Sequence, residues 1–197
     1  IHRERKQGVK APPSAPLKLR PGAFVRLNET PFLLLSDDAR AAFPGEELIV
    51  TGVSETHIDG VPVTRALLRR VGTTRDDILL QVAKDGYGGG IFPTLFTRFD
   101  TVVPATPSGW SNWLDEGGIL GSSSFMIPAD EDPAGHPATI YRRAIWPDTD
   151  EWVVPATFQE DMKSASSSSS RHVESMLFYR TLDGSAALPY IHAAADD

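Results

Sequence analysis

The sequence contains no cysteine. This absence excludes a disulfide framework, a thiolate metal site and a cysteine nucleophile, and it fits a reducing compartment. Long apolar runs are also missing: runs such as residues 32–35 fall far short of the roughly 20 residues that cross a bilayer. No apolar signal segment begins the chain. We therefore expect a soluble, cytoplasmic protein.

Charge is distributed unevenly along the 197 residues. Residues 1–20 carry six basic side chains against Glu4, a balance of +5, so with −7 overall residues 21–197 carry −12. An acidic body argues against nucleic-acid binding by the folded part. We interpret residues 1–20, which contain three prolines, as a disordered basic tail. Such a tail could make weak contact with an acidic surface.

The clearest local pattern lies between residues 48 and 71. Two β-rich runs flank Asp59-Gly60, a pair typical of a two-residue hairpin turn because both central residues need positive φ. The expected register pairs Ile58 with Val61, Thr56 with Val63, Gly52 with Leu67, Leu48 with Val71, Val53 with Ala66 and Thr51 with Leu68.

Other segments indicate further short strands. They are residues 23–27, 77–83, 95–103, 119–127 and a C-terminal unit between 139 and 193, whose run 172–181 is apolar on both faces. Residues 108–117 predict a short helix with Ser108 as its N-cap. The serines at 164 and 166–170 predict a flexible loop. Together these segments predict a mainly antiparallel β fold, α+β at the margin, with one or two short helices. Residues 21–197 would form this single domain as a curled sheet, barrel or sandwich.

No pattern meets the requirements of a catalytic or metal site. The glycine-rich residues 85–90 lack the Lys-Ser/Thr pair of a phosphate loop and predict a hairpin loop with Tyr87 at its tip. Two acidic loops, beginning at Asp130 and Asp148, lack the later ligands of a calcium loop. A weak cation site formed by both loops together stays open. No two histidines are spaced as a local zinc pair. We expect no cofactor and lean against an enzyme.

The tryptophans matter more for function. Trp146 and Trp152 flank a turn that contains Asp148 and Asp150, and they could stack on each other or form an aromatic platform at an interface. With Tyr87, these four residues are the candidate partner- or ligand-binding residues. Core packing is the alternative. Arg142, Arg143 and Arg180 could pair with Glu160, Asp161 or Glu174 in a structural ion network.

The C-terminal unit resembles a known family. The pattern of Tyr141 to Trp146, Trp152 to Pro155, Phe158 to Glu160 and Met176 to Arg180 is similar to that of the YjfK-like proteins, an uncharacterised bacterial family. This sequence has Phe178-Tyr179 where members have a Tyr-Gln pair. The resemblance implies no site residues. It implies a context of membrane stress or polyamine-related chemistry.

Three functions remain in view. The leading hypothesis is a non-catalytic interaction module that binds a protein partner through an exposed edge strand or an aromatic patch around Trp146 and Trp152. The second is a binding protein for a small cation such as a polyamine, which the acidic body would attract. The third is a hydrolase or transferase whose residues converge only in space. The sequence leaves the oligomeric state open.

Overall fold

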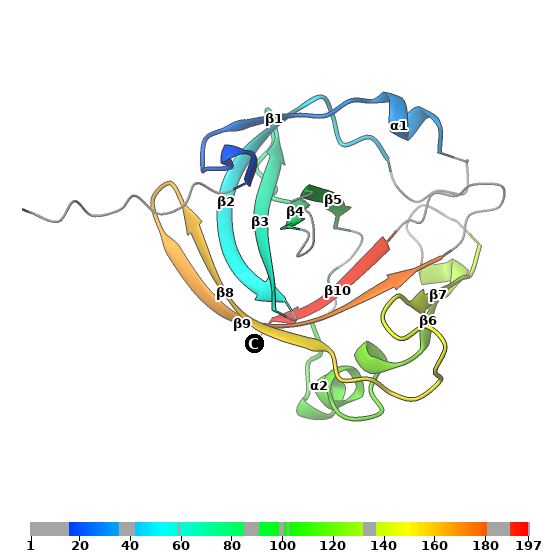
Figure 1. Cartoon of the computed structure of the whole chain (residues 1–197). Helices are drawn as coiled ribbons and strands as arrows, with labels where there is room; N and C mark the ends of the chain where they lie inside the picture. Colours follow the sequence, from blue (N-terminus) through cyan, green and yellow to red (C-terminus); the bar gives the residue numbers. More distant parts are fainter. Residues whose placement is uncertain are drawn as a thin grey trace, which may run out of the picture.

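The computed structural model describes residues 16–35, 42–58, 60–84, 91–98, 101, 103–131, 137–180 and 190–196. Its strands form an antiparallel sheet in the order β5-β4-β3-β2-β8-β9-β7-β6, with β1 added to β2 and β10 added to β9 (Figure 1). The strands are β1 (Phe24–Arg26), β2 (Glu47–Ile58), β3 (Val61–Arg70), β4 (Ile78–Lys84), β5 (Ile91–Thr97), β6 (Ser124–Ile127), β7 (Thr139–Arg143), β8 (Ala156–Ser164), β9 (Ser168–Tyr179) and β10 (Tyr190–Asp196). The helices are α1 (Thr30–Leu33) and α2 (Pro107–Leu114), with 3-10 turns at Pro16–Lys18, Ile119–Gly121 and Ala129–Glu131.

This architecture confirms the predicted fold class, because the chain is mainly antiparallel β with two short α-helices. The sheet is strongly curled, and β10 approaches β5 so that Cα atoms of the two strands lie within 8 Å (Figure 1). These two strands are not paired, so over the described residues the sheet is not closed into a barrel.

The β2–β3 hairpin follows the predicted register over most of its length. Ile58 pairs with Val61 and Gly52 with Leu67, and Gly60 has the positive φ, 78°, that the turn requires. A β-bulge between Val50 and Gly52 then shifts the pairing by one residue. Leu48 therefore lies opposite Arg70, and the predicted partners Val71 for Leu48 and Leu68 for Thr51 were wrong.

Both faces of this hairpin are buried. On β3, Ala66 and Leu68 point into an apolar cluster, while Arg65, which directly precedes Ala66, points to the opposite face, as strand alternation requires. The cluster also contains Ile78, Leu80 and Val82 of β4, which confirms that predicted strand face. Its full buried membership is Leu19, Leu48, Val50, Val53, Ala66, Leu68, Ile78, Leu80 and Val82.

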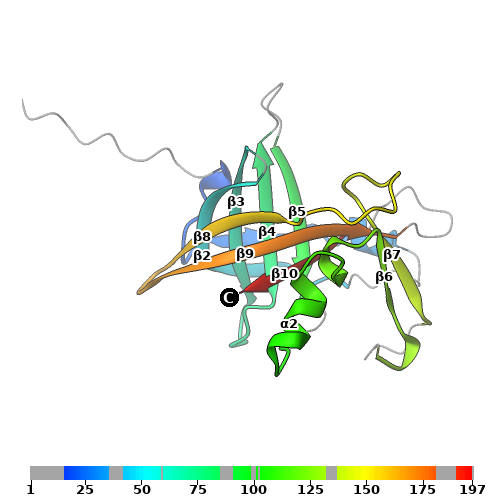
Figure 2. The same ribbon diagram turned by 90° about the horizontal axis from the view of Figure 1, so that it is seen from below.

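The C-terminal strands form a second unit. Strand β9 pairs with β8 and β7 along one edge and with β10 along the other, which confirms the prediction that it is a central strand. Its residues Met176 and Phe178 pack with Leu120 and Tyr141 in a second apolar cluster, beside α2 and the β6–β7 pair. Figure 2 shows β8 and β9 running across one side of the molecule, from β2 to the β6–β7 ribbon.

Several boundaries differ from the predictions. The N-cap of α2 is Thr106, whose hydroxyl accepts the Gly109 N–H, and Pro107 rather than Ser108 begins the helix. Residues 119–121 form a 3-10 turn before β6, and β5 begins at Ile91, four residues earlier than predicted. Among the described residues, no helix is long and apolar enough to cross a membrane.

The serine tract is not a flexible loop, so that prediction was wrong. Ser168, Ser169 and Ser170 belong to β9 and pair with residues 161–163 of β8. The hydroxyl of Ser164 closes the hairpin by accepting from the backbone N–H of Ser167 at 3.0 Å. Because ladder hydrogen bonds use only the backbone, polar serines continue a strand whose side chains face solvent.

Candidate interaction surface

The segment between β7 and β8, residues 144–155, contains no helix or strand. Hydrogen bonds from the buried side chain of Arg143 hold it in one conformation. Arg143 is the last residue of β7, where strand alternation points its side chain inward beside Tyr141. The residue is 1 % exposed. A buried guanidinium needs partners for all its N–H groups.

Backbone carbonyls supply those partners. Nε donates to Ile145 O at 2.8 Å, Nη1 donates to Gly121 O and Glu151 O at 2.8 and 3.0 Å, and Nη2 donates to Trp146 O and Thr149 O at 3.2 and 3.0 Å. These bonds use the five N–H donors that a guanidinium carries. The predicted partners of Arg143 were carboxylates, so that expectation was wrong. Arg143 instead fixes the path of the loop and attaches it to residue 121.

Trp146 leaves this loop toward solvent. Trp146 is 69 % exposed. Its φ of 56° lies in the left-handed region, which residues other than glycine, asparagine and aspartate seldom adopt. The Arg143 guanidinium binds its carbonyl and thereby holds this conformation. The structure thus presents an indole on a fixed backbone.

Trp152 has a different role. It is half-buried, its Nε1 donates to Gly118 O at 3.0 Å, and its ring covers Gly121, where any Cβ would overlap the indole. Among the described residues no ring contact joins Trp146 and Trp152, so the stacked pair considered from the sequence is not formed. Trp152 attaches the loop to the residues that follow α2.

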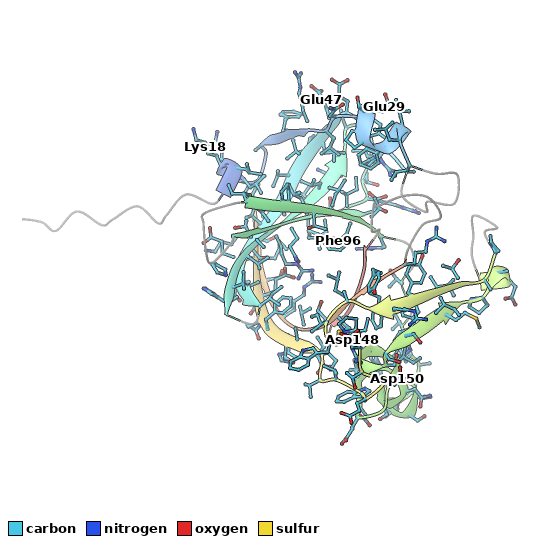
Figure 3. The ribbon with its side chains drawn as sticks, turned by 45° about the vertical axis from the view of Figure 1, so that its right-hand side comes forward. Lys18, Glu29, Glu47, Phe96, Asp148 and Asp150 are labelled. Carbon is cyan, nitrogen blue, oxygen red and sulfur yellow. The ribbon has the colours of Figure 1, made fainter. Side chains whose placement is uncertain are left out.

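The acidic residues of the loop lie at the surface. Asp148 and Asp150 are exposed, and Figure 3 shows them near each other beside α2, at the other end of the molecule from Glu29 and Glu47. The acidic loop that begins at Asp130 lies partly outside the described residues, and Tyr87 lies outside them. Within the described residues, no group of three or more His, Asp or Glu side chains is arranged to hold a metal ion.

The adjoining β6–β7 ribbon has a free edge. Over the described residues β6 pairs with β7 and with no other strand. Arg143 N–H donates to Ser123 O at 2.8 Å, and antiparallel alternation from this bond directs the backbone polar groups of Ser124 and Met126 away from β7. Met126 lies opposite Ile140, and the two are 57 % and 60 % exposed. An edge with apolar side chains of this kind can add a strand.

Sequence reasoning placed Glu160 in a structural ion network but did not identify its arginine partners, Arg65 and Arg171. Glu160 of β8 is fully buried, and its Oε1 accepts from Arg65 Nη1 at 2.9 Å and from Ser54 Oγ at 2.8 Å. Its Oε2 accepts from Arg171 Nη2 at 2.6 Å. The guanidinium of Arg65 also lies over the Phe158 ring, 5.4 Å from its centroid. Alternation on β8, with Phe158, Glu160 and Met162 all buried, was the available signal.

We name as the Trp146 surface the loop 144–155 together with residues 115–119, which follow α2. The hydrogen bond from Trp152 to Gly118 joins these two segments, and a bond from Val153 N–H to Gly121 O at 2.9 Å attaches the loop just beyond them. No protein-family model, no curated protein and no solved structure matches the chain.

Proposed function

We propose that this protein is a non-catalytic interaction module that binds a protein partner through the Trp146 surface. The observation that carries the proposal is the way Trp146 is held. A left-handed backbone conformation at such a residue costs about 1–2 kcal/mol. Exposure of 69 % leaves most of the indole without packing contacts that would offset this cost. Strained conformations of this kind are concentrated at functional sites.

The loop is also prepared for binding. Because Arg143 already fixes four carbonyls within residues 145–151, ordering of this segment would not have to be completed on association. Tryptophan is among the residues that contribute most to binding when a partner covers them. Val154, 72 % exposed on the same loop, adds apolar area. The neighbouring free edge of β6 offers a place for the partner chain to continue.

The wider setting of this function is part of the same proposal. The absence of cysteine supports a cytoplasmic location. The resemblance to the YjfK-like family stays a prediction, and with it a role in membrane stress or polyamine-related systems.

The test is affinity capture of the tagged full chain from cells that express it, with bound proteins quantified by mass spectrometry. We expect a stoichiometric partner that wild type retains and Trp146→Ala loses. Leu34→Ala is the matched control, because Leu34 is 78 % exposed but belongs to the segment after α1. Circular dichroism of each variant checks the fold. Equal recovery of every captured protein by Trp146→Ala and wild type would refute the proposal.

A further inference from the structure

We propose that the partner segment that binds the Trp146 surface is cationic: an extended stretch of a protein in which arginine or lysine alternates with other residues. This inference rests on the proposed function and specifies the chemistry of its partner. It is carried by the exposed charges on the loop that bears Trp146 and on the residues that follow α2.

The charges on the Trp146 surface have one sign. Five carboxylates are exposed on it, contributed by Asp115, Glu116, Asp148, Asp150 and Glu151. Residues 107–121 and 144–155 contain no lysine or arginine. None of the five carboxylates forms an ion pair with a described residue. Their charge is therefore available to a partner.

The cation nearest to these carboxylates along the chain does not neutralise them. Arg143 lies beneath the loop, 1 % exposed, and its N–H groups are directed to backbone carbonyls. Glu151 is bound by Arg143 through its main-chain oxygen, which leaves the carboxylate in solvent. The guanidinium thus holds the acidic loop in shape without pairing its side chains.

The aromatic and apolar groups on this surface suit the same partner. A guanidinium or ammonium group is attracted to the face of a tryptophan, and its aliphatic stem packs on apolar side chains. Trp146 offers the first contact and Val154 the second. A cation seated on the indole would lie next to Asp148, two residues along the chain. Charge complementarity and the exposed ring therefore favour a basic segment over a neutral or acidic one.

The experiment measures fluorescence anisotropy of labelled eight-residue peptides titrated with the full chain. In the three peptides leucine alternates with arginine, glutamine or glutamate. We expect the arginine peptide to bind, with affinity that falls as salt rises, and the glutamate peptide not to bind. Trp146→Ala should weaken binding at least about tenfold. The triple variant Asp148→Asn, Asp150→Asn, Glu151→Gln should also weaken it about tenfold, as expected for three exposed charge pairs.

A matched triple variant controls for net charge. Glu29→Gln, Glu46→Gln and Glu55→Gln removes three exposed carboxylates elsewhere and should leave the affinity unchanged. Equal binding of the arginine and glutamine peptides would overturn the cationic partner while keeping the binding surface. If the control triple variant lost as much affinity as the loop triple variant, the effect would be one of overall charge. That result would also overturn the cationic partner.

Two further outcomes separate this inference from the proposed function. If no peptide binds at millimolar concentration, the cationic segment is overturned, and the capture experiment above still decides whether Trp146 binds a partner. If spermidine displaces the arginine peptide at equal or lower concentration, the surface takes a small polyamine and the peptide is not its occupant.

Discussion

Arg65 Nη1 lies 2.9 Å from Glu160 Oε1, and both side chains are buried although the residues are 95 positions apart in the sequence. The contact joins β3 to β8 across β2. Arg171 and Ser54 bind the same carboxylate from β9 and β2. One carboxylate therefore holds three other strands of the sheet.

We expect Glu160→Gln to lower the free energy of unfolding by about 3–5 kcal/mol, because it removes the buried negative charge to which the Arg65 and Arg171 guanidinium groups are bound. Urea denaturation followed by circular dichroism measures the change. Glu55→Gln, at an exposed position of β2, should change stability by less than about 0.5 kcal/mol. A loss no larger than that of the control would show that the network is not needed for stability.

Arg143→Ala removes a donor from five backbone carbonyls, of which Gly121 O and Trp146 O keep the backbone donors Val153 N–H and Thr149 N–H. We expect a loss of at least about 3 kcal/mol, since each buried carbonyl left without a donor costs about 1–3 kcal/mol and water can reach some of them. Hydrogen exchange of residues 144–153 should accelerate more than exchange in β2 and β3. Arg143→Lys should restore little, because an ammonium group lacks the planar fork. The neighbouring Arg142→Ala, on the exposed face of β7, is the control and should have little effect on either measurement.

Trp146→Asn separates binding from stability. Asparagine tolerates the left-handed conformation better than tryptophan does, so the free energy of unfolding should equal or exceed that of wild type by up to about 1 kcal/mol. Partner recovery should fall as for Trp146→Ala. A decrease in stability above 1 kcal/mol, measured by urea denaturation, would mean that the indole supports the fold.

Thr106→Ala and Ser108→Ala test the start of α2. Thr106 caps the helix by accepting the Gly109 N–H, and its loss should cost about 1 kcal/mol. Ser108 contacts the Thr106 hydroxyl at 3.1 Å but caps no backbone group in α2, so its replacement should cost less. Thermal unfolding of both variants under one set of conditions decides between them, and a larger effect at Ser108 would reverse the assignment.

Much of the sheet could be predicted because local patterns determine it. Asp59-Gly60 specifies a turn, and the period-two spacing of Ile78, Leu80 and Val82 specifies a buried face. The bulge beside Gly52 could not be predicted from local pairing, and the lack of a side chain at Gly52 makes room for Met162, which belongs to a strand distant in sequence. Nor could the serine strand, whose ladder bonds are made by backbone groups that every residue carries.

The candidate surface was predicted only in part. Two tryptophans around an acidic turn indicated the segment that we propose as the binding surface, and Trp146 is exposed in it. The different role of Trp152 depends on the backbone at Gly118 and Gly121, which no local pattern encodes. Arg143 was correctly predicted to lie on a strand. Its partners could not be predicted, because they are backbone carbonyls, which every residue carries, and not side chains of opposite charge.

The backbone ladder at the join between β2 and β8 contains two residue pairs, Gly52 with Ser164 and Val53 with Lys163. On either side of it the strands mostly pair with their neighbours in sequence, β2 through β5 before and β8 through β10 after. Each half can therefore assemble early through short loops, whereas the join must close a separation of more than a hundred residues. We expect this closure to follow the rate-limiting step of folding. Glu160→Gln would then speed unfolding in stopped-flow experiments and leave the refolding rate nearly unchanged, whereas slowed refolding would place the join in the folding nucleus.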